Sequence, residues 1–344
     1  MKGIRALSRS LAWPILVLFV AAACGGTTAP APATAAPTAA PTAAPTIAYP
    51  TQPITLIVPW AAGGDTDVPM RVVAEFVSKE LGQPIVVQNV AGAGGSTGTR
   101  QFKNSAKPDG YTLLSIHEHT IINQHTGVTD YSPLDFEPIA LMVTSYALLA
   151  THTSNPWNTV QDLIDDAKKR PNEITMGMTF GSTTQMFGFL MMNKTGAKFR
   201  PVGYEGTAQR VTALLGKQIQ LGETPLSTAQ QHVKAGTLKI LGAAMEQRDP
   251  RLPEVKTFKE QGLDIVWGTG RGWVAPKGTP KEIVKKMEAA IERALKNPEL
   301  QKKIETEQGS VITFLPSEKY VEKLKQQDAE LKKVIQETGM KSTP

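Results

Sequence analysis

The chain alternates between two hydrophobic periods from about residue 50 onward. Residues 54–58 form an almost continuous apolar run rich in β-branched side chains, which is typical of a buried strand. From Thr66 the apolar residues recur at helical spacing, and this pattern ends at Gly82, a residue type that commonly terminates helices. The predicted apolar face of this helix consists of Val68, Val72, Val73, Phe76 and Val77. Residues 84–88 and 111–115 follow as two further predicted strands, which indicates a strand-helix-strand unit.

The same alternation continues to the C-terminus. Further strands are expected at residues 147–150, 174–178, 239–244 and 273–275, and further helices at residues 159–170, 183–194, 281–295 and 316–337. Residues 92–98 are predicted to form a glycine-rich loop. Strands that alternate with helices favour an α/β protein, and we expect two such units with mainly parallel sheets.

The first residues have the composition of an export signal. Basic residues between Lys2 and Arg9 precede an apolar stretch at residues 11–20, which is too short to span a bilayer, and three alanines follow. The next residue, Cys24, is the only cysteine in the chain, so it has no disulfide partner within it. A lone cysteine at a signal cleavage point resembles the lipobox of bacterial lipoproteins. The resemblance implies a signal peptide at residues 1–23 and a lipid on Cys24.

A low-complexity segment separates Cys24 from the predicted fold. It is almost wholly Ala, Pro and Thr and ends near residue 48, so we expect a semi-rigid tether there. The formal charge of the 344-residue chain is +6, with 37 Lys and Arg against 31 Asp and Glu. Without the three basic residues of the signal, 34 remain against 31, a net charge of about +3. This balance, without a basic block, argues against a nucleic-acid partner.

The stretch from Pro59 to Asp67 joins a strand to a helix through two glycines. The first N–H groups of a helix have no partner within the helix, and anions bind there. Glycines at this junction let a ligand approach the backbone closely, while Thr66 is a reasonable N-cap and Asp67 suits the helix dipole. A plain capped helix start is the alternative interpretation. Residues 179–185 repeat the arrangement after another strand, and the two helix starts could face one cleft.

Two other stretches suggest different chemistry. Residues 94–98 match the G-x-S-x-G motif of α/β hydrolases, but several flexible residues separate Ser96 from the preceding strand, whereas a nucleophile elbow turns sharply off it. His117 and His119, with His125 nearby, could supply imidazoles to a metal, although no cysteine is left to join them. We interpret these histidines as polar groups at a strand end, and we expect no metal and no cofactor.

Several ordered motifs resemble one protein family. They are residues 49–67 (YPTQPITLIVPWAAGGDTD), 81–87 (LGQPIVV), 89–98 (NVAGAGGSTG), 108–114 (PDGYTLL), 202–206 (VGYEG), 234–238 (KAGTL) and 273–280 (WVAPKGTP). They are similar to the solute receptors of tripartite tricarboxylate transporters, the Bug-type extracytoplasmic binding proteins. The similarity extends over essentially the whole chain after the tether.

The resemblance implies a two-lobed type II periplasmic binding protein fold with a hinged central cleft. Lobe 1 would contain residues 49–149 and 271–344, and lobe 2 residues 150–270. The carboxylate-binding loops of the family fall on residues 60–67 and 179–184. The ligand contacts expected on this basis are Trp60, Ala61, Gly63, Gly64, Asp65, Asp67, His117, Phe180, Gly181, Ser182, Thr183, Thr184, Tyr204 and Glu223.

The function implied is that of a non-enzymatic receptor. It would be a monomer anchored by lipid on the periplasmic or outer face of a membrane, and it would deliver a small organic acid to permease subunits. The sequence departs from the family at Asp65, where a small residue or proline is common, and this negative charge should disfavour a second ligand carboxylate nearby. The alternatives are a secreted serine hydrolase that uses Ser96 and a carboxylate sensor subunit.

Overall fold

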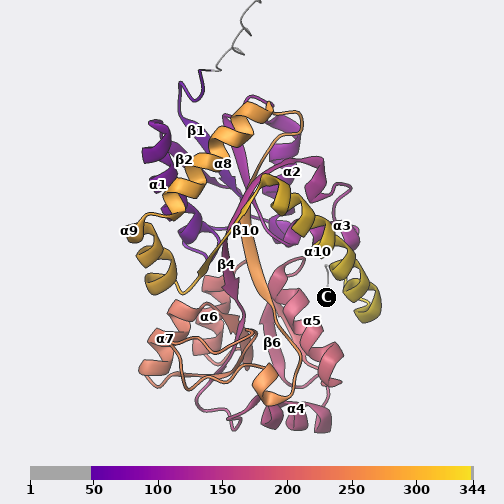
Figure 1. Ribbon diagram of the computed structural model, residues 1–344. Coiled ribbons are helices and arrows are strands. Elements are labelled where there is room, and N and C mark those ends of the chain that lie inside the picture. Colours follow the sequence, from indigo (N-terminus) through magenta and orange to yellow (C-terminus); the bar gives the residue numbers. More distant parts are fainter. Residues whose placement is uncertain (1–47, 342–344) are drawn as a thin grey trace, which may run out of the picture. The chain divides into compact units, whose positions relative to one another are not determined.

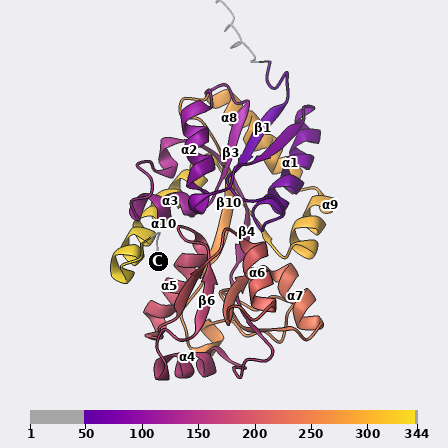
Figure 2. The ribbon, with the colours of Figure 1, turned by 180° about the vertical axis from the view of Figure 1, so that it is seen from behind.

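The computed structural model describes residues 48–341, so the predicted signal, Cys24 and nearly all of the tether lie outside the described residues. The described chain folds into two sheets with helices on their faces, as Figures 1 and 2 show from opposite sides. The predicted α/β class is therefore confirmed. Within this part of the chain every helix is too short or too polar to cross a bilayer.

The first sheet has six strands in the order β11-β4-β10-β3-β1-β2. Their bounds are β1 Ile54–Val58, β2 Ile85–Asn89, β3 Thr112–Ile116, β4 Glu137–Tyr146, β10 Gly268–Ala275 and β11 Val311–Pro316. β1 pairs in parallel with β2 and β3, whereas β10 runs antiparallel to both β3 and β4. The sheet is therefore mixed, and the expectation of mainly parallel sheets is wrong. The alternating pattern identifies strands but not their direction, which depends on how distant segments meet.

The second sheet has five strands in the order β7-β6-β8-β5-β9. Their bounds are β5 Leu148–His152, β6 Thr175–Met178, β7 Arg200–Gly203, β8 Leu221–Thr224 and β9 Leu238–Ala243. It is also mixed, because β6 is parallel to β7 and β8 while β5 is antiparallel to β8 and β9. The chain passes from the first sheet to the second at Ala147 and returns before β10. The predicted lobe boundaries stay a prediction.

The helices follow the sequence expectations most closely where the apolar period is long. Their bounds are α1 Asp67–Leu81, α2 Ser96–Ser105, α3 His119–His125, α4 Val160–Lys169, α5 Thr183–Thr195, α6 Thr207–Leu215, α7 Leu226–Lys234, α8 Lys281–Leu295, α9 Pro298–Gln301 and α10 Ser317–Thr338. Short 3-10 turns occupy η1 Ala93–Gly95, η2 Pro133–Asp135 and η3 Lys259–Gln261, and η4 Lys302–Glu307 is a π-helix turn. The predicted glycine-rich loop is shorter than expected, because α2 begins at Ser96.

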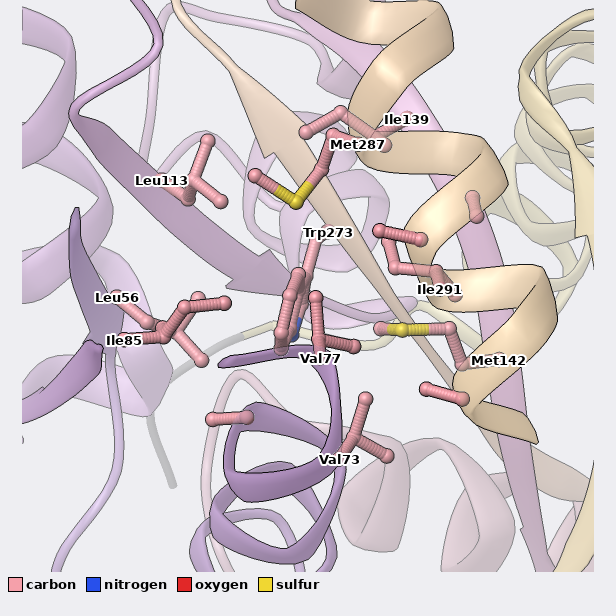
Figure 3. Close-up of a cluster of buried hydrophobic side chains, with 14 of the residues drawn as sticks. Leu56, Val73, Val77, Ile85, Leu113, Ile139, Met142, Trp273, Met287 and Ile291 are labelled. Carbon is pink, nitrogen blue, oxygen red and sulfur yellow. The ribbon is translucent and has the colours of Figure 1, made fainter. Parts of the chain in front are cut away.

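One core lies between the first sheet and the pair α1 and α8. Trp273 of β10 is fully buried at its centre, and its indole N–H lies 3.2 Å from the sulfur of Met70 on α1. Figure 3 shows Val73 and Val77 of α1 and Met287 and Ile291 of α8 around this ring. The predicted apolar face of α1 needs one correction: Val68 is 38% exposed, and Pro69 and Met70 are the first buried apolar residues of the helix.

The opposite face of the first sheet is covered by α2, α3 and α10 (Figures 1 and 2). The main core at the second sheet lies between this sheet and helices α4 and α5, and it contains side chains of both helices and of the strands they cover. These cores fix the ends of β1 and β6, and therefore the starts of α1 and α5 that follow them. The N-termini of α1 and α5 are thus positioned by strands that are packed into these cores.

Candidate functional site

A cavity of about 80 Å³ lies where three helices begin. Its lining comes from the loop before α1, the start of α5 and the start of α6, with His117 and Thr269 completing it. The lining residues are Trp60, Ala61, Ala62, Gly64, Asp65, Thr66, His117, Thr179, Ser182, Thr183, Thr184, Glu205, Gly206, Thr207, Ala208, Gln209, Arg210 and Thr269. The sequence predicted two converging helix starts, and the structure adds α6 as a third.

Asp67 organises the loop before α1. One of its oxygens accepts hydrogen bonds from the Gly63 N–H (2.8 Å) and from Arg71 Nε (2.9 Å), and the other accepts from the Asn89 amide at 2.8 Å. Burial raises the pKa of Asp67, but these hydrogen bonds outweigh it and bring the pKa below its ordinary value. Asp67 does not line the cavity. Its hydrogen bonds instead hold the loop before α1 in place.

Thr66 occupies the N-cap position of α1 but makes no side-chain cap hydrogen bond. Its hydroxyl accepts instead from Nε of Arg271 on β10 at 3.0 Å. Arg271 is fully buried, and it also donates to the Ser145 hydroxyl and to Asp65. The carboxylate of Asp65 is thus the anion that Arg271 pairs with in this structure.

The start of α5 is built from hydroxyl groups. The Ser182 hydroxyl caps the helix by accepting from the Thr184 N–H, and it donates to the Thr179 carbonyl at 2.7 Å. The Gly181 N–H, which we expected to face a ligand, donates to Oε1 of Gln185 at 2.8 Å. The Thr183 hydroxyl accepts from Thr269 of β10 at 3.0 Å. Thr179, Ser182, Thr183 and Thr184 are thus the residues of this loop that line the cavity.

The start of α6 was not anticipated as part of the site. Gly206 is its N-cap and has no side chain to cap the helix, so the N-terminal end of α6 is open toward the cavity. Arg210, one turn into the helix, is buried and pairs with Glu223 at 3.3 Å. Burial raises the pKa of Glu223 to about 7 against the opposing influence of Arg210. The sequence signals next to this helix start are Gly206 and the 202–206 motif that ends with it.

His117 lies against Trp60 in the cavity wall. The two rings stack with centroids 5.1 Å apart and an interplanar angle of 19°. Burial lowers the pKa of His117 well below its ordinary value, with smaller contributions from His119 and Arg271, so the ring is neutral at pH 7. The indole N–H of Trp60 has no hydrogen-bond partner among the described residues. Residues 48–341 contain no cluster of three or more metal-ligating side chains.

The structure brings eight of the predicted site residues to the cavity: Trp60, Ala61, Gly64, Asp65, His117, Ser182, Thr183 and Thr184. Phe180, Gly181 and Tyr204 line a neighbouring cavity of about 520 Å³, which shares Thr179, Glu205 and Gln209 with the first. Gly63, Asp67 and Glu223 line neither of the two. Their roles as ligand contacts stay predictions.

Ser96 does not sit on a nucleophile elbow. β2 ends at Asn89, and the chain passes through η1 before Ser96 opens α2 as a buried residue. A strained strand-to-helix turn that exposes the hydroxyl is therefore missing at this position.

Comparison with known proteins identifies the family. Residues 69–340 match the model of the tripartite tricarboxylate transporter family receptor. A relative from Cupriavidus necator, the "UPF0065 protein in gbd 5'region", is 34% identical over 73% of this chain and 76% of its own length.

Two solved structures extend this comparison. The periplasmic binding protein BugD is 30% identical, with a TM-score of 0.78 over 85% of this chain and 99% of its own. MatC from Rhodopseudomonas palustris, solved with bound malate, is 27% identical, with a TM-score of 0.76 over 83% of this chain and all of its own. These proteins are solute-binding receptors and not enzymes, in agreement with the prediction for this chain. The chain therefore belongs to the tripartite tricarboxylate transporter receptor family.

Proposed function

We propose that this protein captures a small organic carboxylate in the cavity at the starts of α1, α5 and α6. The observation that supports this most is the convergence of three helix N-termini on one cavity. A helix N-terminus carries a partial positive charge and N–H groups that lack a partner within the helix, and the glycines at positions 64 and 206 let an anion approach the backbone. The malate bound in a relative is a carboxylate of this kind.

The expected binding free energy is sufficient for micromolar affinity without a metal. A charge-assisted hydrogen bond to a carboxylate contributes roughly 1.5 to 3 kcal/mol. Each helix dipole adds about 0.3 to 1 kcal/mol. Three or four such hydrogen bonds with three dipoles reach the roughly 8 kcal/mol that a micromolar dissociation constant requires. The neutral His117 and the apolar face of Trp60 would then contact the body of the ligand.

The two sheets give this receptor a means of enclosing its ligand. The loop before α1 belongs to elements of the first sheet, and α5 and α6 belong to elements of the second. A hinge motion at the two passages between the sheets would open and close the cavity, as in other binding proteins. The predicted lobes, 49–149 with 271–344 and 150–270, are the bodies that would move.

The proposal includes delivery to a membrane. A lipid on Cys24 and the tether that follows would hold the receptor at the membrane surface, where it passes its ligand to the permease subunits of the transporter. Incorporation of a labelled fatty acid should depend on Cys24, because the chain contains no other cysteine. Label that persists in Cys24→Ser would contradict the anchor.

A thermal-shift screen against organic acids tests the carboxylate itself. Ligand at 100 times its dissociation constant adds about 2.7 kcal/mol to the free energy of unfolding, which raises the melting temperature by several degrees. We expect at least one acid to produce such a shift, while its uncharged amide or ester does not. If no acid stabilises the protein, the proposed function is wrong.

A further inference from the structure

Arg271 is a fully buried cation with a nearly complete set of partners. Its Nε donates to the Thr66 hydroxyl at 3.0 Å, and its Nη1 donates to the Ser145 hydroxyl at 2.7 Å and to the Thr269 carbonyl at 3.2 Å. Its Nη2 donates to Oδ2 of Asp65 at 2.8 Å. Of these partners only Asp65 carries a charge, so the charge of Arg271 is balanced by this one carboxylate.

Asp65 itself joins three elements at the cavity. It precedes the start of α1, it pairs with Arg271 on β10, and its Oδ1 accepts from the Thr207 hydroxyl at the start of α6 at 3.0 Å. Its side chain is 25% exposed and belongs to the cavity lining. A guanidinium and a hydroxyl at a helix start are the groups that commonly bind a ligand carboxylate. In this protein a carboxylate of the chain already occupies them.

The cation that lines the cavity, Arg210, is also paired. Arg210 is the one Lys or Arg among the described residues that line the cavity, and it binds the side chain and the carbonyl of Glu223. Glu205, which lines the cavity as well, adds a further negative charge. The described lining therefore offers helix N-termini for one carboxylate but no unpaired cation for a second.

We infer that Asp65 is a built-in substitute for a second ligand carboxylate, so that the receptor selects monocarboxylates over dicarboxylates. The inference rests on the proposed function, since it concerns the ligand of the same cavity. A dicarboxylate would place its second charge near Asp65, where the like charges repel and Arg271 is already neutralised. A monocarboxylate meets no such repulsion.

Removal of the Asp65 carboxylate should invert this selectivity. In Asp65→Ala, Arg271 loses its carboxylate partner, and the second carboxylate of a dicarboxylate can take the place of the Asp65 carboxylate. Asp65→Asn keeps the volume and an acceptor oxygen but not the charge, so it should shift selectivity in the same direction with less disturbance of the fold. Asp166→Asn is a matched control, because Asp166 also pairs with an arginine, Arg170, but on α4 away from the cavity.

Calorimetric titration of the full-length chain with two pairs of acids of equal carbon number tests the inference. The pairs are butyrate with succinate and hexanoate with adipate. The wild type should bind the monocarboxylate of a pair roughly tenfold more tightly or better. Both Asp65 variants should lower this ratio by roughly tenfold or more, and Asp166→Asn should leave it unchanged. The melting temperature of Asp65→Ala should fall without ligand and recover with the dicarboxylate but not with its monocarboxylate partner.

The outcomes separate the two claims. A wild type that prefers succinate or adipate, or Asp65 variants that keep the wild-type ratio, overturns the role of Asp65 while leaving carboxylate binding intact. If neither these four acids nor any other acid of the thermal-shift screen binds, the proposed function is wrong and the inference falls with it.

Discussion

Substitution of Gly94 tests directly whether ligand binding requires contact between the loop of Gly94 and the loop of Phe180 and Gly181. It lies in η1, among the elements of the first sheet, and a Cβ at this position would lie 2.6 Å from the carbonyl oxygen of Phe180 and 3.1 Å from Cα of Gly181. Phe180 and Gly181 follow β6 of the second sheet. A hydrogen bond from the Asn123 amide to the Gly94 carbonyl (3.0 Å) holds the glycine in place. Gly94→Ala should therefore obstruct the approach of the two loops.

The magnitude has two parts. Gly94 has a φ of +60°, and an alanine in this left-handed conformation costs roughly 1 to 2 kcal/mol whether or not the loops meet. Ordinary contacts begin at 3.4 Å, so the loops must also separate by about 0.8 Å to admit the methyl group. Overpacking of this kind costs about 1 to 3 kcal/mol, and it applies only when the loops meet. The ligand affinity should therefore fall by about 5- to 160-fold.

Gly127→Ala is the matched control. Gly127 has a similar φ of +77°, but a Cβ there meets no atom within 4 Å. In urea unfolding, both variants should show a similar loss of stability from placing alanine at a positive φ. In calorimetric titration with the best acid of the screen, only Gly94→Ala should bind more weakly. If Gly94→Ala binds within twofold of Gly127→Ala, the contact between Gly94 and Phe180 is not required for binding.

Three further predictions concern the supports of the site. Ser182→Ala removes the side-chain cap of α5 and should lower the free energy of unfolding by about 1 kcal/mol, and an unchanged urea midpoint would contradict the cap. Asp67→Ala removes the acceptor of the Gly63 N–H and one of the two acceptors of the Asn89 amide nitrogen, and it should cost about 2 to 3 kcal/mol by the same measurement; a loss below 1 kcal/mol would argue against this role. The pKa of Glu223 is about 7 in the folded protein and near 4.5 in the unfolded chain. The contribution of this residue to the free energy of unfolding is therefore complete below pH 4.5 and is lost as the pH rises through 7, a fall of up to about 3 kcal/mol. Glu223→Gln should show a shallower decline between pH 5 and 8, and equal slopes in the two proteins would refute this.

The sequence by itself determined the local elements of this protein. The apolar periods placed β1, α1, α4, α5, α8 and α10 within a few residues of their observed bounds, and Gly82 ends α1 in the left-handed conformation, as its position predicted. The glycine and hydroxyl residues before α1 and α5 identified two of the three helix starts at the cavity. These features depend on interactions within one turn or one strand, which neighbouring residues decide.

The tertiary structure alone decided how the charges of the site are paired. Asp65 lies 206 residues from Arg271 and 142 residues from Thr207 along the chain, and nothing local links them. The role of α6 and the antiparallel course of β10 are of the same kind. Each depends on how two separate cores orient the segments between them, because a hydrogen bond or ion pair forms only when packing brings both groups within reach.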